Sequence, residues 1–469
     1  MVSIHSILNT GSKSLSTNQT VINTTSHNIS NVNTPGYSKQ KALLETNDPF
    51  RTNRGQLGTG VGVQSIDRAN TKYIQKQLVD QIPYTAYHKS SHQMLSRVED
   101  QFHDFTGDDI HKVMIDFFDS FSQLSQRPDD VSLREDVRRK GKLLVEKFNG
   151  TDSSLQRMQR EFNMEIEGNL KKVNSLTEKI SELNRRIAVE EASGHQANDL
   201  RDKQEEAVRE LSGIVDIDYF NDSKGFLNVW MDSGEPLVSG KQSYDMVAMD
   251  RADGMKNIGV ERKGSIVNVT ENLRSGELAA IVDVRDSSIA EYRNRIDLLA
   301  ETLAEEVNDI HSGGYGLDLL QRDFFERTDP TESFSASNIR IHGDIEASLD
   351  AIAAGETSDP DEIYGDNRNA IEIASLIENS GFFGTGETFA DYYQTVVGDV
   401  GHEVSEARSS MELASSKEES LMNFRESLAG VNIDEELINL DKFKKAYEAS
   451  SRIINIAGEM LDTVLALKR

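Results

Sequence analysis

Two histidines that lie four residues apart, His88 and His92, have the spacing of metal ligands. On a helix both imidazole rings would share one face, as zinc ligands often do, and His103 and Asp104 follow in the same region. The run around them is polar, so two surface histidines on a solvated helix are the simpler interpretation. We predict no metal site here.

Two other patterns could also perform chemistry. The stretch GTGVGVQSI at 58–66 has glycine at alternate positions, as a dinucleotide-binding loop can have, but the full spacing differs and no capped helix follows it. Asp434, Glu435 and Glu436 form a carboxylate cluster that general acid–base catalysis could use. Negative charge also favours the first turn of a helix, and we assign the cluster to such a start.

The sequence lacks the residue sets on which common enzymes depend. It contains no cysteine, which removes disulfides, thiolate zinc sites and thiol nucleophiles. The His-Glu-x-x-His, phosphate-binding-loop and nucleophile-elbow motifs are also missing. We therefore predict a protein that is not an enzyme and that uses no cofactor.

The 469 residues carry a formal net charge of −28 at pH 7. This charge argues against nucleic acid and anionic membranes as partners, because both are bound through clustered Lys and Arg. No apolar run approaches the ~18–20 residues of a membrane helix, and the N-terminus lacks the basic leader and apolar core of a secretory signal peptide. The length predicts two to four domains.

The N-terminal segment predicts a weak helix with a clear seam. Of the first 34 residues 19 are Ser, Thr or Asn, and at roughly 0.5 kcal/mol each relative to Ala they cost about 10 kcal/mol in helix propensity. Apolar residues nevertheless recur at steps of seven: Leu8, Leu15, Ile22 and Ile29. Ile4 and Val32 take the companion positions. We expect this helix to be disordered in a free monomer and to form where something packs on it.

Proline and glycine in the turn Asn33-Thr34-Pro35-Gly36 should end this helix, and short β-like pieces follow it. The rest of the chain divides by periodicity and turn signals. The predicted segments are an N-terminal axial segment at 1–69, a helical bundle at 70–213, a small β domain at 214–272, a second bundle part at 273–410, and a C-terminal axial segment at 411–469.

Details within these segments follow from the same signals. A heptad seam covers 155–187 and a break is expected at Gly194, with a second helix over 198–211 that ends at Gly213. Helix should return from about 276 to 310, and 311–365 should be irregular. Pro360 is the last proline, so the final 109 residues could all be helical.

Three apolar lines run along the last predicted helix. Each repeats at steps of seven: Leu440, Tyr447, Ile454 and Leu461; Phe443, Ala457 and Val464; Ala446, Ile453, Met460 and Leu467. Together they are wider than a two-helix seam requires. We predict that the first and last helices pair as a coiled coil and that the surplus face meets other subunits. The predicted fold is mainly α, with a long-helix bundle body and a small inserted β domain facing outward.

Both ends of the chain resemble the signatures of the bacterial flagellar axial proteins, which include rod, hook and hook-associated proteins. The motifs are NISNVNTPGYSKQ at 28–40 and GVNIDEELINLDKFKKAYEASSRIINIAGEMLDTVLAL at 430–467. Interior segments such as VNSLTEKISELNRRI at 173–187 are similar to the hook-associated members. Lys39 stands where the family usually has arginine, and KFKKAY at 442–447 replaces a usual YQQAY.

The resemblance implies a structural protein that is exported unfolded through the flagellar type III apparatus and forms a tubular layer between hook and filament. The implied partners are other copies of the chain, the hook protein, a second hook-associated junction protein, flagellin, and an export chaperone on the C-terminal region. The implied location is the flagellum outside the cell. The residues assigned to assembly are Leu8, Leu15, Ile22, Ile29, Asn31, Asn33, Thr34, Pro35, Gly36 and Tyr37 at the N-terminal end, and Leu437, Leu440, Tyr447, Ile453, Ile454, Met460, Leu461 and Val464 at the C-terminal end.

Two alternatives have different consequences. A surface coiled-coil adhesin would use the β domain as its recognition head and would form a stable oligomer with ordered ends. A hook, rod or second junction protein would share the architecture at another position in the flagellum. The interior helical segments argue against these other positions in the flagellum.

Overall fold

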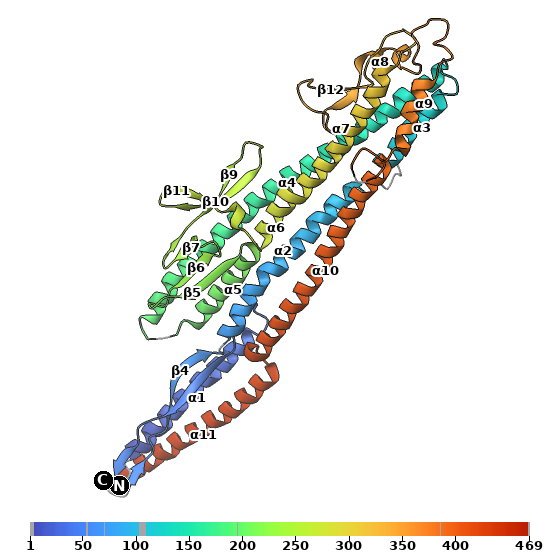
Figure 1. The fold of residues 1–469 in the computed structure, drawn as a ribbon. Coiled ribbons are helices and arrows are strands. Elements are labelled where there is room, and N and C mark those ends of the chain that lie inside the picture. Colours follow the sequence, from blue (N-terminus) through green and yellow to red (C-terminus); the bar gives the residue numbers. More distant parts are fainter. Residues whose placement is uncertain are drawn as a thin grey trace.

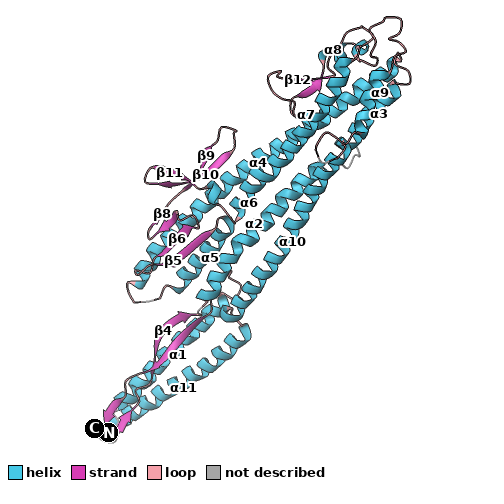
Figure 2. Cartoon of the chain, viewed as in Figure 1, coloured by secondary structure: helices cyan, strands magenta, loops and turns pink. Residues whose placement is uncertain are grey.

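The computed structural model describes residues 4–52, 55–69, 71–102, 109–194, 196–384 and 386–467. The molecule is long and narrow, and both chain ends lie at one extremity (Figure 1). From that extremity the chain forms a narrow arm, a helical body with a β region on one side, and an irregular tip (Figure 2). The predicted mainly α fold with paired terminal helices is confirmed.

The terminal arm consists of the first and last helices and a β-ribbon. Its elements are α1 (Ile4–Ser30), β1 (Gln40–Thr46), β2 (Phe50–Thr52), β3 (Gly55–Leu57), β4 (Val61–Arg68) and α11 (Ile433–Ala466). α11 lies antiparallel to α1, and the ribbon of β1 and β4 lies along α1 (Figure 1). β2 and β3 pair as a separate hairpin. The arm is thus built from segments at opposite ends of the chain.

Long helices form the body. They are α2 (Lys72–Phe102), α3 (Ile110–Leu124), α4 (Val131–Glu191), α5 (Asn198–Ile214), α6 (Glu277–Asp283), α7 (Ile289–Gly313) and α10 (Phe389–Ala429). The heptad residues of α4 are buried, as a sustained seam predicts: Leu155, Phe162, Ile166, Val173, Ile180 and Ile187. α10 packs along α2, and α4 contacts α3, α5 and α7. The body is therefore a bundle in which α4 is the central helix.

Local signals explain where these helices begin and end. The side chains of Asp130, Thr388 and Asn432 accept hydrogen bonds from backbone N–H groups at the starts of α4, α10 and α11. Gly194 has a φ of +86° shortly after α4, a conformation that favours glycine. The predicted break at this residue is confirmed.

Two small antiparallel sheets form the β region. One has the strand order β5-β6-β7-β8 and the other β11-β10-β9. The strands are β5 (Ile217–Asn221), β6 (Leu227–Met231), β7 (Pro236–Ser239), β8 (Gln242–Ser243), β9 (Met246–Asp250), β10 (Lys256–Arg262) and β11 (Ser265–Asn268), followed by the 3-10 turn η1 (Thr270–Asn272). Asn174 and Asn184 of α4 donate to the backbone oxygens of Met246 and Leu227 at 2.9 and 2.8 Å. The sheets and helices share one apolar core.

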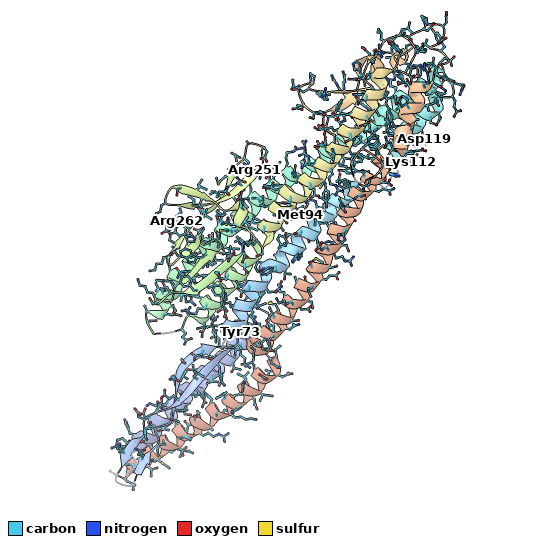
Figure 3. The ribbon with its side chains drawn as sticks, viewed as in Figure 1. Tyr73, Met94, Lys112, Asp119, Arg251 and Arg262 are labelled. Atoms are coloured by element: carbon cyan, nitrogen blue, oxygen red, sulfur yellow. The ribbon has the colours of Figure 1, made fainter. Side chains whose placement is uncertain are left out.

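The tip joins short elements to the far end of the bundle. These are β12 (Phe325–Arg327), β13 (Ile339–Ile341), α8 (Gly343–Ala347), α9 (Arg368–Ser375) and the 3-10 turns η3 (Leu349–Ala351) and η4 (Leu376–Glu378). The rings of Phe117, Phe121 and Phe324 contact one another in the core. Figure 3 shows the side chains along the whole molecule, with Tyr73 labelled at the start of α2 and Arg251 and Arg262 labelled in the β region.

Several boundaries differ from the sequence-based expectation. Gly213 lies inside α5. One turn of π-helix, η2 (Val284–Ser288), joins α6 to α7 and directs Arg285 inward, where its Nη1 donates to Asn163 Oδ1 at 2.6 Å. The last 109 residues are not continuous helix, because a loop precedes α10 and residues 430–432 separate α10 from α11. Residue 411 therefore lies within α10, and residue 70 lies outside the described residues.

Candidate functional site

His88 and His92 lie on α2. His92 Nδ1 lies 3.5 Å from Ser96 Oγ, and burial lowers the pKa of His88. Within the described ranges, no three His, Asp or Glu side chains gather where they could hold a metal ion. His103 and Asp104 lie outside the described residues.

The two other patterns have structural positions. The glycine-rich stretch 58–66 leads into β4, and a Cβ at Gly60 would lie 3.2 Å from Thr10 Cγ2 of α1. Gly60 therefore permits close packing of the β1–β4 ribbon on α1. Asp434, Glu435 and Glu436 occupy the first turn of α11, and this prediction is confirmed. For the segments that the structure describes, no helix is long and apolar enough to cross a bilayer.

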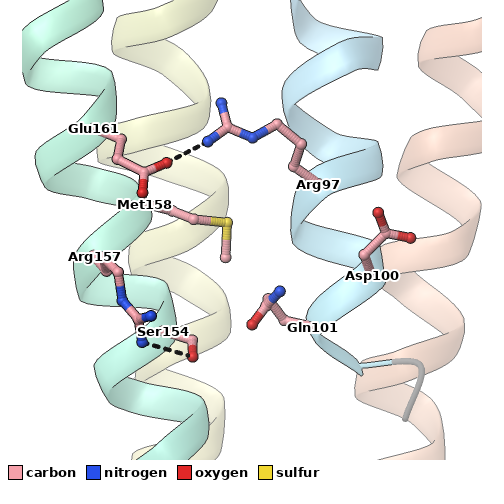
Figure 4. A pocket seen from close by; sticks show the side chains of 7 residues that line it. All are labelled: Arg97, Asp100, Gln101, Ser154, Arg157, Met158 and Glu161. Carbon is pink, nitrogen blue, oxygen red and sulfur yellow. Dashed lines mark hydrogen bonds and ion pairs between the residues drawn. The ribbon is translucent and has the colours of Figure 1, made fainter. Parts of the chain in front are cut away.

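A cavity of about 250 Å³ opens between α2 and α4 (Figure 4). The lining residues are Arg97, Asp100, Gln101, Ser154, Arg157, Met158 and Glu161. Arg97 forms an ion pair with Glu161, and Arg157 Nη2 donates to Ser154 Oγ at 3.3 Å. The Arg97–Glu161 ion pair joins α2 to α4, and the Arg157–Ser154 hydrogen bond lies within α4, so we interpret the cavity as a feature of bundle packing.

α1 buries small and polar side chains against α11 and the β-ribbon. The buried residues of α1 are Gly11, Thr17, Asn18, Val21, Thr24, Thr25 and Asn28. Those of α11 are Glu436, Ser450 and Ala457. The heptad residues Leu8, Leu15, Ile22 and Ile29 are only half-buried in the single chain. The predicted apolar seam thus lies beside the contact with α11 and not at its centre.

Close contacts explain why small residues occupy that centre. A Cβ at Gly11 would lie 2.8 Å from Ile454 Cγ1, so the backbone of α1 approaches α11 closely there. Ser14 Oγ lies 2.9 Å from Ser450 Oγ, and Asn18 Nδ2 donates to the same oxygen at 3.4 Å. The helices are held by hydrogen bonds and close approach as well as by apolar contact.

The predicted assembly residues of α11 divide into two sets. Those half-buried in the single chain are Leu440, Tyr447, Ile454 and Leu461. Those exposed, by 47–53%, are Leu437, Ile453, Met460 and Val464. Ile456 is exposed by 51% on the same helix. The apolar face of α11 is therefore wider than the part that α1 covers.

The Asn-Thr-Pro-Gly turn follows α1 directly. Asn31 Nδ2 donates to the backbone oxygen of His27 at 3.0 Å, and Thr34 Oγ1 donates to Asn31 Oδ1 at 3.2 Å. The side chains of Asn33, Thr34 and Pro35 are exposed. These residues shape the turn and present its outer surface to solvent in the single chain.

Gly36 is the conformationally demanding residue of the turn. Its φ is +76°, and a Cβ there would lie 2.6 Å from Glu206 Oε2 and 2.8 Å from Arg209 Nη2. Its backbone oxygen accepts a hydrogen bond from Arg425 Nη2 at 2.8 Å. Burial, together with the nearby positive charge of Arg425, lowers the pKa of Arg209 to about 10. Only glycine fits this position without displacing the charged groups of α5.

A polar joint, defined as Asn28, Tyr37, Gln40 and Glu436, connects both terminal helices to the start of β1. Asn28 Oδ1 accepts from Tyr37 Oη at 2.8 Å and from the backbone N–H of Gln40 at 3.0 Å. Asn28 Nδ2 donates to the backbone oxygen of Gln40 at 2.9 Å and to Glu436 Oε2 at 3.1 Å. Since Asn28 and Glu436 are 1% and 2% exposed, this buried amide has all its hydrogen-bonding groups engaged.

Electrostatics keep the groups around the joint in their bonding states. Burial and the charges of Asp199, Asp202 and Glu436 raise the pKa of Tyr37, so its hydroxyl remains a donor. Burial alone would lower the pKa of Lys39, but Glu435 and Glu436 raise it. Lys39 Nζ lies 3.0 Å from Glu435 Oε2 and 3.1 Å from Glu436 Oε1.

Asp202 of α5 fixes the arm to the body. It accepts from the backbone N–H of Ser38 at 3.1 Å and from Arg68 Nη1 at 2.6 Å, and Arg68 Nη2 donates to Glu205 at 2.7 Å. Burial raises the pKa of Asp202, and the hydrogen bonds and charge of Arg68 oppose that change. Partly buried, charge-assisted hydrogen bonds therefore help to attach the arm to the body.

Sequence reasoning located the turn but not its partners. Asn28 and Gln40 are the first and last residues of the motif NISNVNTPGYSKQ, so the limits of this motif could have indicated that both residues have a role. Asp202 and Arg425 gave no local signal, because they act on residues 164 and 389 positions away. Glu436 was assigned to a helix start and has in addition a partner on α1.

Family comparisons cover the body and both ends of the chain. Residues 95–325 match the family described as "Flagellar hook-associated protein FlgK helical domain". Residues 427–467 match "Flagellar basal body rod FlgEFG protein C-terminal", and residues 8–37 match "Flagella basal body rod protein". The two terminal matches cover all of α11, most of α1 and the turn.

Curated relatives align with the whole chain. Flagellar hook-associated protein 1 of Bacillus subtilis is 26% identical over 98% of this chain and 97% of its own length. The proteins of the same name from Salmonella typhimurium and Escherichia coli are 24% and 23% identical, each over 99% of this chain and 100% of their own. The solved flagellar hook junction protein FlgK from Burkholderia pseudomallei has a TM-score of 0.67 at 12% identity, over 75% of this chain and 100% of that one. That structure shares the fold.

Proposed function

The chain belongs to the family of flagellar hook-associated protein 1, structural components of the flagellum outside the cell, and on that premise we propose that it forms the junction layer between hook and filament. In this layer, copies of the chain assemble into a tube through the terminal arm. The assembly residues are those assigned above on α1, the Asn-Thr-Pro-Gly turn and α11. The body and tip then lie outside the ring of arms.

The observation that carries this proposal is the uncovered apolar face of the arm. On α11 four large residues at three- and four-residue steps share one exposed face: Ile453, Ile456, Met460 and Val464. On α1 the heptad residues Leu8, Leu15 and Ile22 are half-buried beside the contact with α11. A contiguous apolar face on a soluble chain favours an interface. Neighbouring copies of the same arm offer a matching surface.

The composition of α1 supports export in an unfolded state. Because 19 of the first 34 residues are Ser, Thr or Asn, α1 has low intrinsic helix stability and depends on α11 and the ribbon for its order. A segment of this kind unfolds at little cost for passage through a narrow channel. It becomes a helix again when the arms pack together.

The partners follow from this position. Hook protein lies below the layer, and a second hook-associated junction protein and the flagellin filament lie above it. An export chaperone covers the C-terminal region before export, since the exposed face of α11 would otherwise promote aggregation. The match over 95–325 supports this position over that of a hook or rod protein, because the rod-type matches are confined to the two ends.

The test separates assembly from folding. In the double variant Ile456→Asp/Met460→Asp, charges replace two residues of α11 that are 51% and 49% exposed. Secretion and helix content should remain near wild type, whereas hooks should carry no filaments when cells are viewed by electron microscopy. Val189→Asp, at a residue of α4 that is 75% exposed, is the matched control and should leave filaments normal. Normal filaments in the double variant would exclude this face as the assembly surface.

A further inference from the structure

The apolar lines of α1 and α11 do not define a single pairing. Leu8, Leu15, Ile22 and Ile29 repeat at sevens on α1, and Leu440, Tyr447, Ile454 and Leu461 repeat at sevens on α11. If one helix slides by seven residues, about 10.5 Å, each line falls on itself again. Apolar contact alone therefore allows several similar registers.

The polar contacts between the helices do not repeat in this way. Ser14 pairs with Ser450 at 2.9 Å between hydroxyl oxygens, and Asn28 Nδ2 donates to Glu436 Oε2 at 3.1 Å. On each helix the two contact residues are fourteen positions apart. Both contacts consequently form in the same register, and a slide of one heptad breaks both.

A slide would leave buried polar groups without partners. With α11 moved by seven residues toward the joint, Asn28 would face Phe443 and Ser14 would face Ala457. The amide of Asn28 would lose its carboxylate partner in a site where its side chain is now 1% exposed. An unpaired buried amide is costly, whereas an apolar side chain at that position would tolerate the shift.

We propose that the Asn28–Glu436 hydrogen bond, supported by the Ser14–Ser450 contact, sets the register in which the two terminal helices pair. The two residues are positioning residues: they select one pairing among several that the apolar lines permit. A uniform register gives every copy of the arm the same surface. This inference concerns the single chain and does not depend on where in the flagellum the protein acts.

The connection between α10 and α11 offers a rival explanation. Only residues 430–432 separate these helices, and this short segment restricts how far α11 can slide. A test must therefore change the polar pair and leave the connection intact. The double variant Asn28→Leu/Glu436→Leu replaces both partners with apolar side chains and keeps the connection. It also removes the bonds from Asn28 to Tyr37 and to the Gln40 backbone, so it is compared with the conservative variants given below.

Disulfide formation in the full-length chain reports the register directly, because the natural sequence has no cysteine. The pair Ser14→Cys/Ser450→Cys reports the observed register. The pairs Ser14→Cys/Ala457→Cys and Ser14→Cys/Phe443→Cys report slides of one heptad in the two directions, and a disulfide cannot bridge those positions without a slide. Each pair is equilibrated in glutathione buffer, and its effective concentration is measured. Since these probes replace Ser14, they isolate the effect of the Asn28–Glu436 pair.

In the otherwise natural chain, the first pair should exceed either shifted pair by at least tenfold, which corresponds to about 1.4 kcal/mol. In the Asn28→Leu/Glu436→Leu background this preference should fall by about tenfold. The control Asn23→Leu/Glu448→Leu places the same side chains at exposed positions of the same helices and should leave the preference unchanged. An unchanged preference in the first background would overturn the proposal and assign the register to the connection or to the close approach of Gly11 and Ile454. Equal yields from all three pairs in the natural chain would overturn it as well.

Two conservative variants keep the test decisive if the leucine variant fails to fold. Glu436→Gln retains an oxygen that accepts from Asn28, so the preference should persist. Asn28→Asp is isosteric but removes the Nδ2 donor and places a second carboxylate beside Glu436, so the preference should fall. If both variants retain it, the hydrogen bond does not set the register.

Discussion

Acidification should loosen the tip through His311, a fully buried residue near the end of α7. Its Nδ1–H donates to the backbone oxygen of Arg322 at 2.7 Å, and the backbone N–H of Ala353 donates to Nε2 at 2.9 Å. The ring also packs edge-on against Phe324, with 5.3 Å between ring centroids. A neutral imidazole satisfies both hydrogen bonds. A protonated one cannot accept from Ala353, so protonation breaks a link between α7 and the tip.

The size of the effect follows from the pKa. Burial lowers the pKa of His311 from its model-compound value of 6.5 to about 4, although the hydrogen bond to the Arg322 carbonyl acts in the opposite direction. The unfolded chain takes up a proton near pH 6.5 and the folded chain only near pH 4. The contribution of His311 to stability is therefore fully present above pH 6.5 and is lost as the pH falls between these values. At 1.36 kcal/mol per pH unit, the loss reaches about 3 kcal/mol.

Urea unfolding followed by circular dichroism between pH 7.5 and 4.5 measures this loss. His311→Leu cannot titrate, so it should be less stable than wild type at pH 7.5 but lose less as the pH falls. The difference in the free energy of unfolding between the two proteins should shrink by about 2–3 kcal/mol at pH 4.5. Ile345→Val changes a fully buried residue of the tip that carries no titratable group, so it should lower the free energy of unfolding equally at each pH and keep the pH dependence of wild type. Parallel curves for wild type and His311→Leu would refute the reasoning.

Two further predictions concern the arm. Gly36→Ala should weaken the attachment of the arm by about 1–2 kcal/mol, because alanine disfavours the positive φ at this position. The rate of proteolysis within 4–69 should therefore rise by roughly 5–30-fold. Gly398→Ala is the control: a Cβ there meets nothing within 4 Å, so the rate should not rise. In the free wild-type chain, a protease should cleave within 4–52 and 433–467 before it cleaves the body, because small polar residues form much of the α1–α11 interface. If these ends resisted the protease as well as α4 does, the account of a weak arm would be contradicted.

Much of the fold could be predicted from local pattern. The seam on α4 predicted one long helix because Ile166, Val173 and Ile180 recur at steps that place them on one face. Asp434 and its neighbours predicted the start of α11 because carboxylates favour the first turn of a helix. The separation of α10 from α11 was not predicted at the right place, since α10 continues through 411 on a surface supplied by α2.

The contact between the two terminal helices could be predicted only in part. Heptad spacing predicted apolar lines on α1 and α11, but it placed the apolar seam of α1 at the centre of the pair. In the structure that centre is formed by small and polar residues such as Gly11 and Ser450, because close approach of the two backbones leaves no room for leucine there. Periodicity gives the face of a helix and not its distance from a neighbour.

The sequence by itself determined the helices, the turn at 33–36, the β-rich interval and the surplus apolar surface, since each depends on residues close together in the chain. Only the tertiary structure decided which partners meet: Asn28 with Glu436, Ser38 with Asp202, and the carbonyl of Gly36 with Arg425. Hydrogen bonds act over about 3 Å in space whatever the separation in sequence, so a local pattern cannot specify them. The path of the chain brings these groups together.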